Sequence, residues 1–189
     1  AAGALEECMT GAATPAQVGA FLAGLRLRGE TPALVAACLD VMFRHAEPVD
    51  APNVIDLCGT GGDGIDTFNV STAAGFVLAA SGVRVAKHGN RAASSRCGSA
   101  DVLEALGART DLGGAAVASG VDRCGISFLF APRFHPAMRH VGGPRREIGI
   151  RTLFNILGPL ANPARPGTQM VGVGAAAIGF FFEIVRRAG

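Results

Sequence analysis

The sequence has no apolar stretch long enough to cross a membrane. A membrane-spanning helix needs roughly 20 apolar residues, and the longest candidate, residues 171–182, is shorter. Glu6 and Glu7 stand where a secretory signal peptide would carry basic residues. We therefore expect no membrane partner and a cytoplasmic location.

Paired cysteines are also lacking. The five cysteines are an odd number without a C-x-x-C pair, which argues against a disulfide framework or a zinc site and favours a reducing compartment. A chain of 189 residues buries roughly 70% of its unfolded surface and needs no disulfides to fold. No cysteine is therefore predicted to be a metal ligand.

Lysine and net charge are low as well. Lys87 is the only lysine, and the formal net charge is +2, which argues against a protein that coats nucleic acid. Arginines cluster over residues 133–151, so nucleic-acid binding stays open as an alternative that predicts a steeply salt-dependent affinity for DNA. The main expectation is that the protein has no nucleic-acid partner.

The first 50 residues have the pattern of a small helical domain. Thr14 and Thr31 each precede a proline, which pairs an N-cap with a favoured first helical residue. Apolar residues follow both at helical spacing, and the first helix ends near Gly29. Part of this apolar surface is a candidate dimer face.

From Val54 onward, short apolar runs alternate with helical stretches, which is typical of βαβ units and a parallel sheet. Helices are predicted to begin at N-caps Ser71 and Ser99. Strands are predicted over residues 54–58, 83–86, 127–131 and 170–173. The expected fold class is α/β, with a small N-terminal helical domain and a mainly parallel sheet flanked by helices.

A long insert separates the third and fourth predicted strands. Helical pieces are predicted over residues 137–141, 145–149 and 152–157, and the insert is expected to pack on the N-terminal helices. The domains are therefore predicted as residues 1–50 with 134–163, and residues 51–133 with 164–189.

Abundant glycine marks the loops that follow the strands. The chain has 27 glycines, and several lie in short runs of the kind found where backbone approaches another group closely. In a parallel sheet the carboxyl ends of all strands share one edge, where ligands bind. Residues 59–64, 87–91 and 132–135 are predicted to meet there, bringing a glycine run together with one lysine, two arginines and two histidines.

The first of these loops matches G-x-G-x-x-G, the dinucleotide fingerprint. That fingerprint needs its third glycine at the start of the helix and an acidic residue at the end of the second strand. Here the helix starts near Ser71 and the second strand leads into Lys87, so the dinucleotide hypothesis is disfavoured. The loop retains a run of backbone N–H groups able to hold phosphate or pyrophosphate.

The following segment, residues 69–72, has two interpretations. Ser71 alone would make an ordinary N-cap. Alternatively, the positive helix end and its hydroxyls suit a phosphate, with the Ser71 oxygen on Mg²⁺. Lys87 would add a point charge, and Ser94, Ser95 and Ser99 further hydrogen bonds.

Three ordered motifs resemble one family. The strings DLCGTGGD at 56–63, KHGNR at 87–91 and RREIGIRTLFNILGPLAN at 145–162 are similar to the anthranilate phosphoribosyltransferases of tryptophan biosynthesis, over residues 14–173. The related pyrimidine nucleoside phosphorylases fit less well after the Lys-His pair. The resemblance implies that the amine of anthranilate displaces pyrophosphate from C1 of phosphoribosyl pyrophosphate, with Mg²⁺, in a homodimer formed through the helical domains.

The resemblance also implies residue roles. Lys87, Asn90 and Arg145 would be the catalytic residues, and Ser71 would bind the metal. Anthranilate would contact Asn90, Ala131, Pro132, His135 and Arg145. The phosphoribosyl donor would be held by Gly59, Gly62, Asp63, Thr67, Asn69, Val70, Ser71, Thr72, Lys87, His88, Gly89, Asn90, Arg91, Ala92, Ala93, Ser94, Ser95 and Ser99.

The implied chemistry needs positioning and charge stabilisation rather than a covalent nucleophile. An aniline nitrogen is weakly basic, so His88 and His135 are expected to orient groups rather than to act as obligatory bases. Family members continue beyond the fourth strand to an adjacent Asp-Glu pair that binds Mg²⁺. The resemblance therefore predicts a shortened member, for which a non-catalytic phosphate- or nucleotide-binding module is the alternative.

Overall fold

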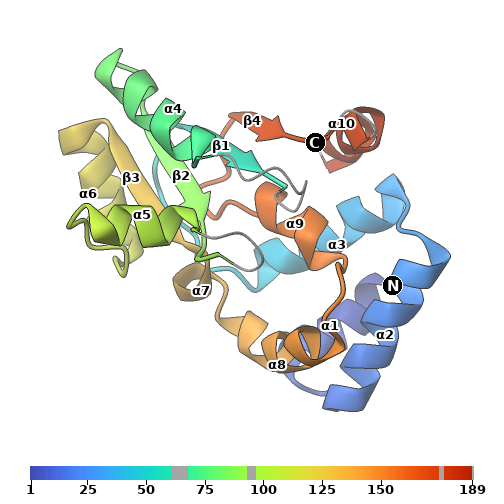
Figure 1. Ribbon diagram of the computed structural model, residues 1–189. Coiled ribbons are helices and arrows are strands. Elements are labelled where there is room, and N and C mark those ends of the chain that lie inside the picture. Colours follow the sequence, from blue (N-terminus) through green and yellow to red (C-terminus); the bar gives the residue numbers. More distant parts are fainter. Residues whose placement is uncertain (61–67, 93–96, 175–176, 189) are drawn as a thin grey trace. The chain divides into compact units, whose positions relative to one another are not determined.

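The computed structural model describes residues 1–60, 68–92, 97–174 and 177–188 (Figure 1). The chain divides into two compact units. The helical unit comprises Ala1–Ala46, His135–Ala161 and Gly174–Gly189, and the α/β unit comprises Glu47–Phe134 and Asn162–Val173.

The α/β unit contains a four-stranded parallel sheet, as predicted. Its strands are β1 (Ile55–Gly59), β2 (Val85–Gly89), β3 (Ile126–Phe130) and β4 (Thr168–Gly172), in the order β3-β2-β1-β4. The prediction ended the second strand at Ala86 because polar residues follow. The structure continues that strand through Lys87 and His88, whose side chains are both buried.

Four helices accompany this sheet in the described residues: α4 (Val70–Ala80), α5 (Ser99–Ala105), α6 (Gly114–Cys124) and α7 (Ala131–Phe134). The predicted N-caps are wrong, because α4 is capped by Asn69 and α5 by Gly98. The sequence analysis missed α6, because its only buried residues are Val117 and Val121. Two apolar positions four residues apart are too narrow a stripe to stand out in a segment rich in glycine and alanine.

Both faces of the sheet carry apolar cores. Successive residues of a strand point to opposite faces, so Leu129 joins one cluster and Phe128 the other. The first cluster also contains Val117 and Val121 of α6, and the second also contains Leu103 of α5. The sheet thereby fixes its strands. At their carboxyl ends β1 and β2 continue into loops, whereas β3 leads directly into α7, so residues 132–134, predicted as part of a loop, are helical.

The helical unit contains α1 (Ala2–Thr10), α2 (Pro15–Arg28), α3 (Pro32–Arg44), the 3-10 helix η1 (Pro136–Met138), α8 (Arg139–Ile148), α9 (Phe154–Leu160) and α10 (Ile178–Ala188). The threonine caps form as predicted. Thr14 Oγ1 accepts from the Gln17 N–H at 3.3 Å, and Gln17 Oε1 accepts from the Thr14 N–H at 2.8 Å. Thr31 Oγ1 accepts from the Leu34 N–H at 3.3 Å. No helix among the described residues is both long and apolar enough to span a membrane.

The insert packs on the N-terminal helices within this unit. Helix α8 contacts α1 and α2, and α9 contacts α3. Of the pieces predicted at 137–141 and 145–149, residues 137–138 belong to η1, and residues 139–148 form one helix that continues through the buried Pro144. Residues 174–189 also belong here rather than with the sheet, because α10 packs on α3 and buries Phe181 and Ile184.

Candidate functional site

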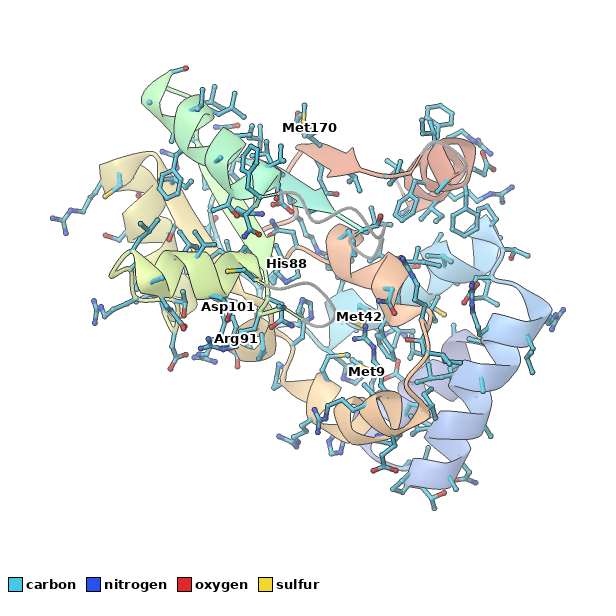
Figure 2. All side chains as sticks on the ribbon, viewed as in Figure 1. Met9, Met42, His88, Arg91, Asp101 and Met170 are labelled. Atoms are coloured by element: carbon cyan, nitrogen blue, oxygen red, sulfur yellow. The ribbon has the colours of Figure 1, made fainter. Side chains whose placement is uncertain are left out.

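Buried polar residues gather along β1 and β2 in the α/β unit. Lys87 and His88 are the third and fourth residues of β2, with 3% and 6% of their surfaces exposed, and Asp56, the second residue of β1, is fully buried. Figure 2 labels His88 beside the segment that leads to Arg91. Burying a charge without hydrogen-bonding partners costs free energy. The contacts of these groups therefore show how the site is built.

Lys87 places its ammonium between β1 and the start of α4. Its Nζ donates to the Leu57 carbonyl at 2.7 Å and to Ser71 Oγ at 3.2 Å. Burial lowers the pKa of Lys87, and the neighbouring Asp56 and Cys58 act in the opposite direction. The sequence analysis predicted that Lys87 and Ser71 act at one site, and the structure brings the two side chains together.

Asp56 faces the same region from β1. Its Oδ1 accepts from the His88 backbone N–H at 3.1 Å, and its Oδ2 accepts from Gln169 Nε2 of β4 at 2.9 Å. Burial raises the pKa of Asp56, although an Asn162 hydrogen bond and the charge of Lys87 act to lower it. No role was predicted for Asp56, although a carboxylate inside an otherwise apolar strand was a visible signal.

The loop after β2 turns sharply against α5. A Cβ at Gly89 would lie 2.3 Å from Ser99 Oγ, so only glycine fits there. Ser99 Oγ donates to the Asn90 carbonyl at 3.3 Å. Asp101 accepts from the Ala92 N–H at 3.0 Å and the Gly98 N–H at 2.8 Å. These contacts bring the two predicted site residues Asn90 and Ser99 together.

Two arginines predicted at this edge are engaged by carboxylates. Arg91 pairs with Glu104 at 2.7 Å and Asp101 at 3.2 Å, and its guanidinium lies over the Phe130 ring at 5.5 Å. Arg133 pairs with Glu47 at 2.8 Å. Both guanidinium groups are therefore paired with carboxylates, whereas the Lys87 ammonium donates to a carbonyl and a hydroxyl.

The start of α4 contributes Asn69, Val70, Ser71 and Thr72. The Asn69 side chain donates to the Cys97 carbonyl at 3.3 Å and so links α4 to the segment before α5. Val70 is exposed and Ser71 is half-buried. Of the remaining predicted donor contacts, Gly62, Asp63, Thr67, Ala93, Ser94 and Ser95 lie outside the described residues.

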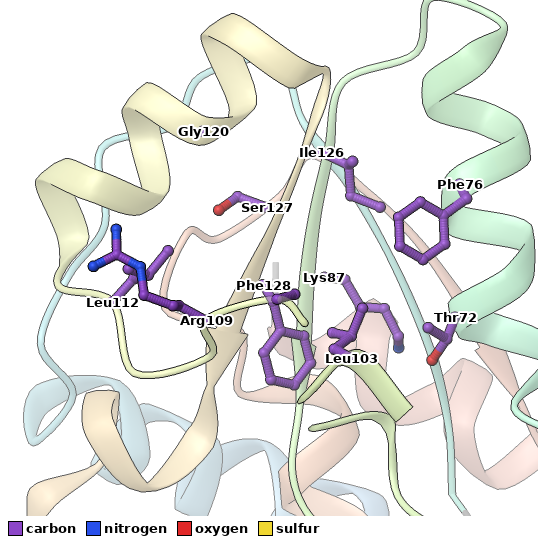
Figure 3. Close-up of a pocket in the computed structure, with 11 residues that line it drawn as sticks. Thr72, Phe76, Lys87, Leu103, Arg109, Leu112, Gly120, Ile126, Ser127 and Phe128 are labelled. Carbon is purple, nitrogen blue, oxygen red and sulfur yellow. The ribbon is translucent and has the colours of Figure 1, made fainter. Parts of the chain in front are cut away.

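Thr72 lines a partly open cavity of about 230 Å³ (Figure 3). The cavity lies among α4, α5, α6 and β3, and its walls include Phe76, Leu103 and Phe128. Thr72 is 3% exposed, and its Oγ1 has no hydrogen-bond partner among the described residues. The aliphatic stem of Lys87 borders the same cavity.

The predicted anthranilate contacts are divided between the units. Asn90, Ala131 and Pro132 belong to the α/β unit, and His135 and Arg145 belong to the helical unit. His135 is buried and donates from Nε2 to the Ala161 carbonyl at 2.9 Å, and burial lowers its pKa. The Arg145 guanidinium lies over the Phe154 ring at 5.8 Å, and burial lowers its pKa also.

Family models match both units. Residues 51–180 match the model described as the a/b domain of a glycosyl transferase family, and residues 1–46 match the helical bundle domain of a glycosyl transferase family. The second span contains the first three helices, and the first contains all four strands together with α8 and α9, which belong to the helical unit.

Curated relatives carry the name anthranilate phosphoribosyltransferase. One from Chloroflexus aurantiacus is 59% identical over 180 residues, which is 94% of this chain and 53% of the relative. Another, from Alkalilimnicola ehrlichii, is 60% identical over 171 residues, which is 89% of this chain and 51% of the relative. The chain thus spans about half the length of the curated relatives it matches.

Solved structures are similar across most of the chain. The anthranilate phosphoribosyltransferase of Thermus thermophilus superposes with a TM-score of 0.93 at 44% identity, over 100% of this chain and 58% of that one. The Saccharomyces cerevisiae protein in complex with PRPP and Mg gives 0.84 at 34% identity, over 92% of this chain and 50% of that one.

Proposed function

The chain belongs to the glycosyl transferase family, and from that premise we propose that it transfers the phosphoribosyl group of phosphoribosyl pyrophosphate to the amine of anthranilate and releases pyrophosphate. This is the reaction of tryptophan biosynthesis that the resemblance implies. The names of the curated relatives and the PRPP complex of the yeast protein support the substrate class.

The observation that carries the proposal is the position of Lys87. Its ammonium lies at the edge where β1 ends in Gly59 and where α4 begins, and it contacts Ser71 there. A buried cation beside a helix N-terminus suits the phosphate oxygens of a donor. Lys87 would bind the charge that develops on the leaving pyrophosphate.

A magnesium ion fits this donor set. The Ser71 hydroxyl is a hard oxygen ligand, and Mg²⁺ in proteins takes few protein oxygens and keeps water and substrate phosphates as its other ligands. Within the part of the chain that the structure describes, no group of three His, Cys, Asp or Glu could hold a metal ion. When bound, the ion would neutralise charge on the pyrophosphate.

Anthranilate would contact Asn90, Ala131, Pro132, His135 and Arg145, as the resemblance implies. Arg145 carries the guanidinium that suits a carboxylate, and Asn90 would orient the aromatic amine. Because its ring is buried and its Nε2 donates to a carbonyl, His135 would act by orienting its surroundings rather than by taking a proton. Burial lowers the pKa of His135 and keeps the ring neutral near pH 7.

A second candidate function rests on the α/β unit alone. Lys87 and Ser71 both belong to this unit, which can bind the donor as a non-catalytic phosphate- or nucleotide-binding module. In either case we propose a cytoplasmic homodimer formed through the helical unit, where Leu27 of α2 is 88% exposed.

Two measurements distinguish these functions. The chain is mixed with phosphoribosyl pyrophosphate, Mg²⁺ and anthranilate, and the loss of anthranilate fluorescence reports transfer. Calorimetry with pyrophosphate and Mg²⁺ reports binding. Turnover supports the enzyme, binding without turnover supports the module, and the absence of both contradicts both proposals.

A further inference from the structure

The two central strands of the sheet pair over a shorter length than their neighbours do. Within the described strands, the parallel ladder between β1 and β2 registers only Ile55 with Val85. The ladders β1–β4 and β2–β3 each register five residue pairs along their whole length. The carboxyl halves of β1 and β2 are therefore not held together by a regular backbone ladder.

Side chains cross between these strands where the ladder stops. The Asp56 carboxylate of β1 accepts from the His88 backbone N–H of β2 at 3.1 Å. In the other direction, the Lys87 ammonium of β2 donates to the Leu57 carbonyl of β1 at 2.7 Å. Each strand thus uses a side chain to reach the backbone of the other, and the residues concerned are adjacent in each strand.

The same carboxylate also reaches the neighbouring strand. Its second oxygen, Oδ2, accepts from Gln169 Nε2 of β4 at 2.9 Å, and Asp56 is fully buried. Beside it, Asn162 Nδ2 donates to the Ala86 carbonyl at 2.8 Å, which ties β2 to the segment that leads into β4. A buried carboxylate with charge-assisted bonds on both oxygens has a well-defined orientation.

We infer that Asp56 is the positioning residue of the site: its carboxylate holds the carboxyl half of β2, and with it Lys87, at a fixed place relative to β1 and the start of α4. This inference rests on the proposed function, because it assigns Asp56 a role in binding the phosphate groups of the donor. Asp56 acts through the backbone of His88 and does not itself touch the donor.

The inference differs from a general contribution to folding. If Asp56 contributed only to folding, its replacement would lower the free energy of unfolding. Any other core substitution that lowers this free energy by the same amount would then weaken binding equally. If Asp56 positions the site, its replacement weakens binding more than the loss of stability explains. A side chain that keeps the acceptor for the His88 N–H then restores binding. Asp56→Asn keeps that acceptor, whereas Asp56→Ala removes it.

The test uses the whole 189-residue chain with pyrophosphate and Mg²⁺ in a calorimeter, at a temperature where every variant is folded. Loss of a hydrogen bond that positions the site weakens binding by about tenfold in Asp56→Ala. In Asp56→Asn the affinity stays within about threefold of wild type, because the amide oxygen replaces the carboxylate oxygen. Val121→Ala, a buried truncation in α6, is the control for lost stability and binds as wild type does.

A second measurement reads the geometry without any ligand. Amide hydrogen exchange followed by NMR is expected to accelerate at His88 in Asp56→Ala by about tenfold, with Leu129 on the β3 side unchanged and Asp56→Asn close to wild type. If Asp56→Ala binds pyrophosphate as wild type does, or if Val121→Ala weakens it equally, the inference is wrong.

A wild-type chain that binds no pyrophosphate overturns the proposed function instead. In that case the exchange of the His88 amide still decides the structural half of the inference: unchanged exchange in Asp56→Ala overturns it, and accelerated exchange supports it.

Discussion

The two units differ in the kinds of side chain that they bury. The helical unit buries apolar side chains such as Leu5, Leu22 and Val35 and is organised by threonine caps at its surface. The α/β unit also has apolar cores, but it buries Asp56 of β1 and Lys87 of β2 within its sheet. Apolar burial stabilises a fold directly, whereas buried charges cost free energy unless they are paired and hydrogen-bonded.

This contrast separates stability from function within one chain. The polar groups of the α/β unit gather where β1 and β2 lose their ladder, and so they lie at the edge that the resemblance assigns to the phosphoribosyl donor. Buried charges in the site destabilise the folded state, and the apolar clusters on both faces of the sheet offset that loss of free energy. Substitutions in the two units should therefore affect different measurements.

The largest expected effect is on stability in the helical unit. Leu5→Ala leaves a cavity at a residue that is fully buried, and we expect it to lower the free energy of unfolding by about 2–5 kcal/mol. Denaturant titration measures this, and calorimetry on the folded variant is expected to give unchanged pyrophosphate affinity. Leu106→Ala, at a 72% exposed position of the α/β unit, is the control and should change stability by about 0.5 kcal/mol or less. A loss of binding in folded Leu5→Ala would break the separation of the two units.

Next in size is the loss of the buried cation. Lys87→Met keeps an apolar stem of similar length and removes the ammonium that contacts Leu57 and Ser71. We expect pyrophosphate affinity to fall by about tenfold to a hundredfold, because a charged hydrogen bond to the anion is lost. Arg84→Met is the matched control: Arg84 precedes β2 and pairs with Asp122 at 2.8 Å, so it removes a cation at the amino end of the same strand. Equal losses in both variants would mean that net charge, and not the site, governs binding.

A smaller effect with opposite signs is expected from one substitution made in both units. Thr72→Val removes a buried hydroxyl that has no partner among the described residues, and should raise the free energy of unfolding by about 1 kcal/mol. Thr31→Val removes a hydroxyl that caps α3, and should lower it by about 1 kcal/mol. Thermal denaturation compares the two. If Thr72→Val instead destabilises the chain or weakens pyrophosphate binding, the Thr72 hydroxyl serves the donor site as the resemblance implied.

The smallest effect is a pH dependence of opposite sign at two carboxyls. Hydrogen bonds from Arg186 and Arg187 lower the pKa of Glu183 in α10 to about 2, so its contribution to stability is present above the unfolded value of 4.5 and is lost as pH falls toward 2. Burial raises the pKa of Asp56 above 3.8, so its contribution is fully present below 3.8 and is lost as pH rises through the folded value. Carboxyl ¹³C NMR titration of wild type, with Glu183→Gln and Asp56→Asn to assign the signals, measures both. Shifts in the same direction at both sites would contradict this account of their surroundings.

Local signals in the sequence were enough to predict much of the fold. The Thr-Pro pairs located α2 and α3 because capping depends on neighbouring residues alone. Apolar runs located four parallel strands for a similar reason. Helix α6 was missed because only Val117 and Val121 are buried, and α8 was predicted as two pieces because Pro144 in a helix interior is unusual.

Less of the site was visible in the sequence. The association of Lys87 with Ser71 was predicted because the loops after parallel strands share an edge. The role of Asp56 was not, because its contacts with His88 and Gln169 join positions 32 and 113 residues away in the chain. Such contacts depend on strand order and register, which no local pattern in β1 encodes.

The most direct test of the central claim, that the donor binds at the carboxyl ends of β1 and β2, is an NMR titration of the ¹⁵N-labelled chain with phosphoribosyl pyrophosphate and Mg²⁺. The account predicts saturable shifts at the amides of Gly59, Lys87 and Gly89, with the amides of Leu22 and Val35 in the helical unit unchanged. Saturable shifts confined to the helical unit, or no shifts at those three residues, would contradict it.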